Sequence, residues 1–301
     1  MLFRRQNRYR LSGYLFAISA TALWSGNFII ARGLSESIPP VSLAFYRWVV
    51  AVIVFLPFAL KPFLREWDCL RAHLPYLSMT ALLGVTLFNT LIYFAGHTTT
   101  ALNLSLISIT FPIFIVILSR IIYGEQVTAM KGIGIVMVMA GVILLITRGN
   151  ISRLLNISFA VGDVWMLGAA IIFAIYSIVL KHKPEQLSIW AFQLSTFILG
   201  LAFLLPFFIW ESVTTPAVEF DPKIVGSIFY VGIFASLAAF VLWNKAIVLV
   251  GPSRAGMVYY TMPLFSGVLA TIFLGEAVGI FHLYSVLLIV PGILIANYDL
   301  K

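Results

Sequence analysis

The sequence predicts an all-α protein that crosses a membrane ten times and is built as two inverted copies of a five-helix unit. Three observations predict this fold: an apolar composition, ten apolar runs of helical length, and an internal repeat. Hydrophobic residues make up 61% of the 301 residues and charged residues only 10%, against roughly 45–50% and about 25% in soluble domains. So few charges cannot cover a soluble protein of this length, which excludes a water-soluble enzyme.

The apolar runs have the length of membrane-spanning helices, which need about 20 residues each. The connections between them are short and leave no room for a separate soluble domain. The first run follows four arginines, but it is too long for a signal-peptide core and no A-x-A cleavage pattern follows it. We therefore interpret it as the first membrane helix. The expected spans are 11–31, 41–60, 75–96, 101–122, 130–147, 161–180, 188–210, 224–244, 251–274 and 278–298.

The basic residues indicate which side of the membrane each connection faces. Short cytoplasmic loops are rich in Lys and Arg, and with cytoplasmic termini the inner segments hold thirteen such residues and the outer segments four. We expect an integral protein of the cytoplasmic (inner) membrane of a prokaryote, with both termini in the cytoplasm. The net charge of +8 then reflects topology and attraction to anionic lipid, not to nucleic acid. The four outer residues are Arg32, Arg148, Arg153 and Lys223.

An internal repeat divides the chain into two units. We expect the first repeat, with its basic cytoplasmic N-terminus, at 1–148 and the second, inverted repeat at 161–301. Because five helices are an odd number, the second unit enters the membrane from the opposite side, as in secondary transporters that work by alternating access. A duplicated membrane scaffold or enzyme without transport is the alternative. Offsets of 151 and 149 match Pro112 with Pro263, Gly124-Glu125 with Gly275-Glu276, and Gly13 with Gly162.

Residues 24–27 read Trp-Ser-Gly-Asn, and Arg47 follows Phe45-Tyr46 in the second span. Together with the two matched Pro…Gly-Glu signatures, these motifs resemble the drug/metabolite transporter superfamily, specifically its EamA family. The resemblance covers about 11–298. It implies a ten-helix carrier of the exporter type for small metabolites, amino acids among them, with a central cavity between the halves.

The second repeat departs from this pattern. It lacks the Trp-x-x-Asn motif and the arginine of the first repeat, so we expect the two halves to contribute different chemistry. The residues found at those places are Phe173, Tyr176 and Thr196.

Polar side chains inside the spans are the candidate cargo-binding groups, because a bilayer disfavours them unless they pair or face water. Asn89, Tyr93 and His97 lie on one helical face of the third span, and Trp24 and Asn27 share a face of the first. Hydrogen bonds that only pack the helices together are the alternative role. The candidate substrate-binding residues are Trp24, Asn27, Asn89, Tyr93, His97, Tyr176, Trp243 and Asn244.

Pro112 and Pro263 occupy equivalent positions inside two spans. Each lacks a backbone N–H and frees the carbonyl four residues earlier, at Ser108 and Tyr259. Paired interruptions in two repeats point to a binding site or a hinge. A kink that only shapes the packing is the alternative.

Arg47 is the basic residue that lies well inside a span. It could attract an anionic group of the cargo, or it could hydrogen-bond helix carbonyls and hold the bundle together, and we favour the structural role. Glu125 and Glu276 lie in turns, where we expect their carboxylates to accept hydrogen bonds from the first N–H groups of the following helix. All eleven acidic residues lie in loops or near span ends, which disfavours a carboxylate proton relay.

These observations predict a secondary or facilitative carrier for small organic metabolites. The resemblance to the EamA family implies export, with amino acids, aromatic ones included, as the favoured cargo. A carrier for another metabolite, such as a nucleoside or vitamin, is the alternative within transport. A non-transporting membrane scaffold or enzyme is the alternative from another class. The scattered histidines, the lone Cys69 and the lack of a phosphate-binding loop lead us to expect no metal, no cofactor and no enzymatic activity. The expected partners are a small-molecule substrate and the lipid bilayer, for a monomer or weak homo-oligomer.

Overall fold

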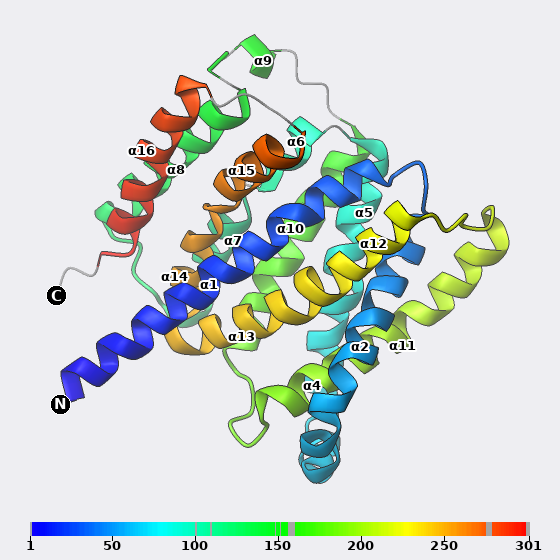
Figure 1. The fold of residues 1–301 in the computed structure, drawn as a ribbon. Helices are drawn as coiled ribbons and strands as arrows, with labels where there is room; N and C mark the ends of the chain where they lie inside the picture. The colour runs from blue at the N-terminus through cyan, green and yellow to red at the C-terminus, as the bar shows by residue number, and fades with distance from the viewer. Residues whose placement is uncertain are drawn as a thin grey trace.

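The structure is a computed structural model that describes residues 2–99, 101–108, 110–147, 149–150, 152–155, 160–274 and 279–298. Over these residues the chain forms helices and no strand (Figure 1). The first half contains α1 (Leu2–Gly33), α2 (Pro40–Arg65), α3 (Trp67–Ala72), α4 (Leu74–Ala81), η1 (Leu82–Leu87), α5 (Phe88–Thr98), α6 (Ala101–Ser108), α7 (Thr110–Tyr123) and α8 (Ala129–Thr147). After the short α9 (Ser152–Leu155), the second half contains α10 (Val161–Leu180), α11 (Ile189–Thr214), α12 (Pro222–Tyr230), η2 (Val231–Ala238), α13 (Ala239–Val250), α14 (Pro252–Tyr259), α15 (Met262–Leu274) and α16 (Ile280–Ala296).

Local sequence signals fix several helix ends. Pro40 and Pro222 begin α2 and α12, where the missing N–H of proline leaves no helical hydrogen bond unmade. Asp221 Oδ1 caps α12 by accepting a hydrogen bond of 2.6 Å from Ile224 N. Gly251 ends α13 with a φ of 83°, a conformation that favours glycine. These signals place the reversals of the chain between the long apolar helices.

Within the described residues, seven helices are long and apolar enough to cross a membrane, and the chain is an integral membrane protein. Each of the ten predicted spans coincides with a helix or with a run of consecutive helices. The ninth is divided into α14 and α15 by a turn at Tyr260 and Thr261, so the count of ten crossings stays a prediction. The seven helices are Tyr9–Ala31, Pro40–Arg65, Leu74–Thr98, Ala129–Thr147, Val161–Leu180, Ile189–Thr214 and Pro222–Val250, and shorter apolar helices lie at Thr110–Tyr123 and Ile280–Ala296.

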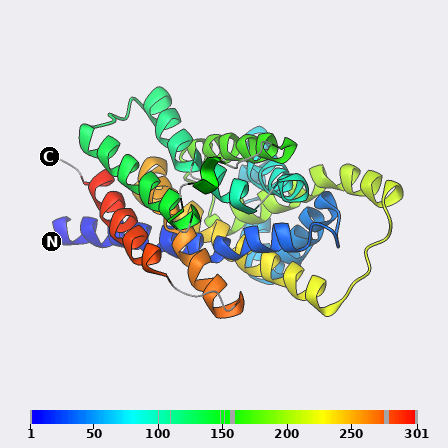
Figure 2. The same cartoon turned by 90° about the horizontal axis from the view of Figure 1, so that it is seen from above.

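The packing of the helices follows the internal repeat. α1 packs along α13, and their repeat counterparts α10 and α5 also pack along one another. α2 packs against its own counterpart α11, and α8 lies beside its counterpart α16 at one edge of the bundle (Figure 2). α1 begins and α16 ends at the same edge, whereas α10 begins at the opposite edge (Figure 1). An inverted two-fold relation between the halves accounts for these exchanged contacts.

α2 and α11 lie antiparallel, and a carboxylate at the end of each helix binds the start of the other. Glu211 in α11 accepts hydrogen bonds from the backbone N–H groups of Val41 and Ser42, at 3.1 and 2.6 Å. Glu66, which follows α2, accepts one from Ser188 N at 2.8 Å. A helix start has unsatisfied N–H groups and a partial positive charge, so both carboxylates stabilise the helix that they cap. The pair is therefore joined at both of its ends.

A π-helical segment lies within the third span of each repeat: η1 joins α4 to α5, and η2 joins α12 to α13. Leu82 and Val231 begin these segments and differ by 149 positions, whereas Phe88 and Ala239 follow them and differ by 151. The two extra residues of the second repeat therefore lie in η2, which has eight residues where η1 has six. π-Helical turns are rare and occur often at functional sites, so the surroundings of η1 and η2 are the candidate site.

Candidate functional site

Arg47 lies in the first third of α2, two turns from its start, and none of its surface is exposed (0%). Its Nε donates a hydrogen bond of 2.7 Å to Ser236 Oγ in η2. Its Nη1 donates to Asn89 Oδ1 in α5 at 2.8 Å and to Asn27 Oδ1 in α1 at 3.2 Å. The guanidinium therefore connects three helices of the first repeat with one segment of the second.

The Tyr93 hydroxyl completes this group of side chains. It accepts a hydrogen bond of 2.5 Å from Arg47 Nη1 and donates one of 3.0 Å to Asn27 Oδ1. The guanidinium carbon also lies 5.2 Å from the centre of the Trp48 ring and 5.6 Å from that of Tyr93, within the range of cation–π attraction. We name Asn27, Arg47, Asn89, Tyr93 and Ser236 the arginine cluster.

The arginine cluster corrects the expectation that Arg47 bonds helix carbonyls, because its partners are side-chain oxygens. Two backbone carbonyls of the π-helical segments already accept hydrogen bonds from side chains other than Arg47. Asn89 Nδ2 donates to Gly84 O at 3.3 Å, and Ser236 Oγ donates to Val231 O at 2.8 Å. Asn89 and Ser236 therefore each bond a backbone oxygen of a π-helical segment and accept a hydrogen bond from Arg47. Through them, Arg47 is connected to η1 and η2 at once.

Among the described residues, no carboxylate compensates the charge of Arg47, since its four hydrogen-bond partners are neutral side chains. Its Nη2 is buried and has no hydrogen-bond partner. A buried cation is unfavourable unless it is paired or fully hydrogen-bonded. The arginine cluster thus holds a positive charge with one donor group unsatisfied.

Two tryptophans of the first repeat bind further carbonyls of the π-helical segments. Trp24 Nε1 donates to Ala235 O of η2 at 2.8 Å, and Trp48 Nε1 donates to Val85 O of η1 at 3.0 Å. The repeat counterparts of both tryptophans are phenylalanines, which have no N–H to donate. The first repeat therefore supplies the indole donors that bind both segments.

A second polar cluster lies at the equivalent place in the second repeat. Tyr176 OH donates to Asn244 Oδ1 at 2.8 Å, and Asn244 Nδ2 donates to Gln193 Oε1 at 2.5 Å. Gln193 Nε2 lies 3.5 Å from Thr196 Oγ1. We name Tyr176, Gln193, Thr196 and Asn244 the neutral cluster, because it contains no charged group. Tyr176, Thr196 and Asn244 occupy the repeat positions of Asn27, Arg47 and Tyr93.

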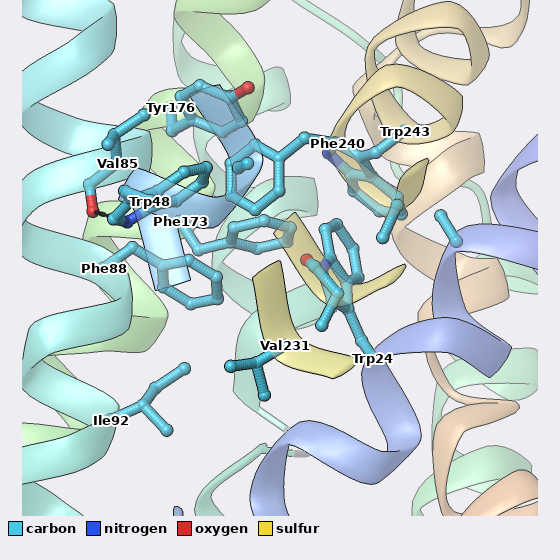
Figure 3. Packing of buried hydrophobic residues seen from close by; sticks show 14 of the residues in the cluster. Trp24, Trp48, Val85, Phe88, Ile92, Phe173, Tyr176, Val231, Phe240 and Trp243 are labelled. Carbon is cyan, nitrogen blue, oxygen red and sulfur yellow. Dashed lines mark hydrogen bonds between the residues drawn. The ribbon is translucent and has the colours of Figure 1, made fainter. Parts of the chain in front are cut away.

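Aromatic side chains of both repeats pack together in a layer (Figure 3). Within it, Trp48 contacts Arg47 of the arginine cluster, and Phe240 contacts Tyr176 of the neutral cluster. The Trp24 ring centre lies 5.5 Å from that of Phe173, 5.7 Å from that of Phe240 and 5.3 Å from that of Trp243. Phe240 in turn contacts Trp48, beside Arg47, at 5.2 Å. Trp24 is 4% exposed and the other rings of the layer are more deeply buried. The rings of the layer are therefore closed off from the surface in this conformation.

The structure brings most of the predicted cargo-binding residues together. Trp24 and Trp243 lie in the aromatic layer, whereas His97 lines a cavity at one end of the bundle. Gln193 and Trp48 were not predicted. A polar amide inside the seventh span is the signal that could have identified Gln193, whereas the hydrogen bond of Trp48 depends on a contact with another helix. Asn27, Asn89 and Tyr93 lie in the arginine cluster, and Tyr176 and Asn244 in the neutral cluster.

The predicted helix interruptions lie near this layer. Pro112 is buried in α7, whereas Pro263 follows the turn that separates α14 from α15. Tyr259 packs against Trp24 with 6.2 Å between ring centres, and Ser108 ends α6 as a buried residue. Their role as a hinge stays a prediction.

The expectation for Glu125 is corrected. Its carboxylate lies 3.8 Å from Lys181 Nζ, and the start of α8 is capped by Thr128, whose Oγ1 accepts from Lys131 N at 3.2 Å. Thr128 directly precedes α8, so its short side chain reaches the first turn, whereas Glu125 lies three residues farther away. Glu276 lies outside the described residues.

Cavities of opposite charge lie at the two ends of the bundle. One of about 820 Å³, which we name the acidic cavity, lies where α2 begins and α11 ends, and its described lining residues include four carboxylates and no Lys or Arg. At the other end, adjoining cavities of about 650 and 280 Å³ share Arg254, and we name them the basic cavities. Burial lowers the pKa of Lys183, which lines one of them. The acidic residues are Glu36, Glu211, Glu219 and Asp221, and the charged residues of the basic cavities are Glu125, Lys131, Lys181, Lys183, Glu185 and Arg254.

Known proteins with similar sequences are named as transporters. The EamA-like transporter family matches residues 11–147 and 160–298. A protein of Archaeoglobus fulgidus, named an uncharacterized transporter, is 29% identical over 90% of this chain and 92% of its own length. Another of that name, from Methanothermobacter thermautotrophicus, is 26% identical over 97% of this chain and 88% of its own. A solved crystal structure shares the fold, with a TM-score of 0.75 at 19% identity over 95% of this chain and 96% of that one.

Proposed function

Because the chain belongs to the EamA-like transporter family, we propose that this membrane transporter exports amino acids, aromatic ones included. It works by alternating access between its two inverted repeats, as a secondary or facilitative carrier. It lies in the cytoplasmic membrane of a prokaryote with both termini in the cytoplasm, so that cargo enters from the side rich in basic loops.

The aromatic layer between the two polar clusters is the observation that carries this proposal. Aromatic rings pack well against planar or apolar side chains, and the layer is formed by residues of both repeats. The amide and hydroxyl groups beside it can hydrogen-bond the polar end of a small zwitterion. Binding pockets combine these two features, an apolar wall and a few fixed polar groups.

The positions of the cavities support alternating access. The acidic and basic cavities lie at opposite ends, and the buried aromatic layer lies in the middle of the bundle. Exchanging the conformations of two inverted repeats opens such a layer to one side and then to the other. Each cavity would then be the entrance to the layer in one of the two states.

Counterflow in proteoliposomes tests the proposal. Purified protein is reconstituted with an unlabelled compound inside, and uptake of the radiolabelled compound is measured for the twenty amino acids, a set of nucleosides and a set of vitamins. We expect exchange of amino acids, with phenylalanine, tyrosine or tryptophan among them, and no exchange in protein-free liposomes. Exchange of a nucleoside or vitamin without any amino acid would replace the proposed cargo. No exchange of any compound by folded protein would contradict transport.

A pair of tryptophan variants shows whether the layer is the site. Trp24→Ala removes a ring from the aromatic layer, whereas Trp210→Ala removes one that is 65% exposed on the outside of the bundle. We expect the first variant to lose counterflow and the second to keep it. Equal loss in both, at equal folded yield, would place the cargo elsewhere.

A further inference from the structure

We propose that Arg47 binds the carboxylate of the cargo through Nη2 and Nε, and that the carboxylate takes the place of Ser236 Oγ on this edge of the guanidinium. This inference rests on the proposed function and assigns one chemical group of the cargo to one residue. It also gives the released Ser236 a part in opening the site.

The first argument is that one hydrogen-bond donor group of Arg47, its Nη2, has no acceptor. Arg47 is fully buried, its Nη2 has no hydrogen-bond partner, and its bonded neighbours are uncharged. An anionic group of the cargo would supply both the missing acceptor and the missing negative charge. Hydrogen bonds between charged groups are the strong ones, and a planar guanidinium binds a carboxylate with two parallel bonds.

The second argument is how the hydrogen-bond partners of Arg47 are divided between its Nη1 and Nε atoms. Nη1 is occupied by three oxygens, those of Asn27, Asn89 and Tyr93, all from the first repeat. Nε has one partner, Ser236 Oγ of the second repeat. Nε–H and the outer N–H of Nη2 point in the same direction, so a carboxylate that bonds both displaces only Ser236. The bonds of Nη1 stay in place.

The displaced Ser236 explains how binding is coupled to a change of conformation. Its Oγ also donates to Val231 O at 2.8 Å, so the hydroxyl keeps a partner when it loses Arg47. What is lost is the direct bond from α2 to η2, one of the contacts between the repeats. A carboxylate at Arg47 therefore weakens the closed arrangement, whereas a cargo without a carboxylate leaves the bond in place.

Ligand binding to the purified full-length protein tests this inference. L-Phenylalanine, 3-phenylpropanoate and L-phenylalaninamide share the ring, but the last has no carboxylate. Tryptophan fluorescence reports binding, because Trp24 and Trp48 lie beside the site. We expect phenylalaninamide to bind about 10- to 100-fold more weakly than phenylalanine, the effect of a hydrogen bond to a charged group.

Two variants of Arg47 distinguish the effect of its positive charge from the effect of its planar, bidentate guanidinium. Arg47→Gln loses the charge, and Arg47→Lys keeps it but cannot form two parallel bonds, so we expect both to lose affinity for the two carboxylates. Arg120→Gln, which removes an exposed arginine at the end of α7, is the matched control and keeps it. Ser236→Ala binds both carboxylates more tightly, because nothing has to be displaced.

Several outcomes would overturn the inference. One is equal affinity of wild-type protein for phenylalanine and phenylalaninamide, and another is unchanged affinity in folded Arg47→Gln. If that variant does not fold, weaker carboxylate binding by Ser236→Ala overturns it instead. Absence of binding of every carboxylate also contradicts it. Binding of 3-phenylpropanoate that depends on Arg47, in a protein that exchanges no amino acid, would refute the proposed export while supporting this inference.

Discussion

The hydroxyl of Tyr176 donates a hydrogen bond of 2.8 Å to Asn244 Oδ1, and this bond repeats in reverse order the bond of 3.0 Å from Tyr93 to Asn27. In the first repeat the asparagine is on the first helix and the tyrosine on the third. In the second repeat the two residues are exchanged. Each half thus connects its first and third membrane helices through the same chemical pair, and the charge of Arg47 distinguishes the first half from the second.

Removing the hydroxyl of each tyrosine in turn measures the contribution of each hydrogen bond to stability. Tyr93→Phe takes a partner from Arg47 as well as from Asn27, whereas Tyr176→Phe breaks one bond between neutral groups. We expect a loss of about 1.5–3 kcal/mol in the free energy of unfolding for the first and about 1 kcal/mol for the second, measured by denaturation in detergent. Tyr93→Phe also lowers counterflow more than it lowers folded yield. Equal effects of the two variants on both measurements would show that the charge of Arg47 does not distinguish the clusters.

The two carboxylates that cap α2 and α11 differ in the number of bonds that they accept. Glu211 accepts from Val41 N, Ser42 N and Ser42 Oγ, whereas Glu66 accepts from Ser188 N. We expect Glu211→Gln to lower the free energy of unfolding by about 1–3 kcal/mol, because a buried charged acceptor is lost, and Glu66→Gln to lower it less. Thermal unfolding in detergent measures both. A larger loss in Glu66→Gln would contradict the capping scheme.

A methyl group on Gly84 tests the contact between η1 and the neutral cluster. A Cβ at this position would lie against the ring of Tyr176, closer than real Cβ contacts allow. Gly84→Ala therefore displaces Tyr176 from Asn244 and lowers both stability and counterflow. Gly226→Ala in α12 is the control, since a Cβ there meets nothing within 4 Å, and in a helix it raises stability by about 0.5–1 kcal/mol. If both variants were stabilised, the close packing of Tyr176 on Gly84 would be refuted.

Much of the fold could be predicted because length and periodicity are local properties. Runs of about 20 apolar residues predicted the helices, and the two family matches, one in each half of the chain, agree with two repeats. The change of offset from 149 to 151 corresponds to the two extra residues that the structure places in η2. The offsets did not show that these residues lie in a π-helical segment, because an offset gives the number of added residues and not the backbone hydrogen bonds that they form.

The candidate site could be predicted only in part. Helical spacing placed Asn89 and Tyr93 on one face, and both contact Arg47. The partners of Arg47 were expected to be carbonyls, and the carbonyls proved to be occupied by Asn89 and Ser236. The bonds of Trp48 and Gln193 cross between helices, and no spacing within one helix predicts them.

Thiol accessibility tests most directly the central claim that the buried layer between the repeats opens to both sides of the membrane in turn. Cys69 is the one cysteine of the chain, so Cys69→Ser gives a background for single cysteines. Thr196→Cys places a thiol in the neutral cluster, at a position that is 2% exposed, and Ser285→Cys places one at a fully buried position in α16.

Right-side-out and inside-out vesicles are treated with a membrane-impermeant maleimide, and labelling is measured for each variant. Alternating access predicts that Thr196→Cys is labelled from both sides while Ser285→Cys stays unlabelled. If Thr196→Cys were labelled from neither side or from one side only, in a protein that still performs counterflow, the central claim would be contradicted.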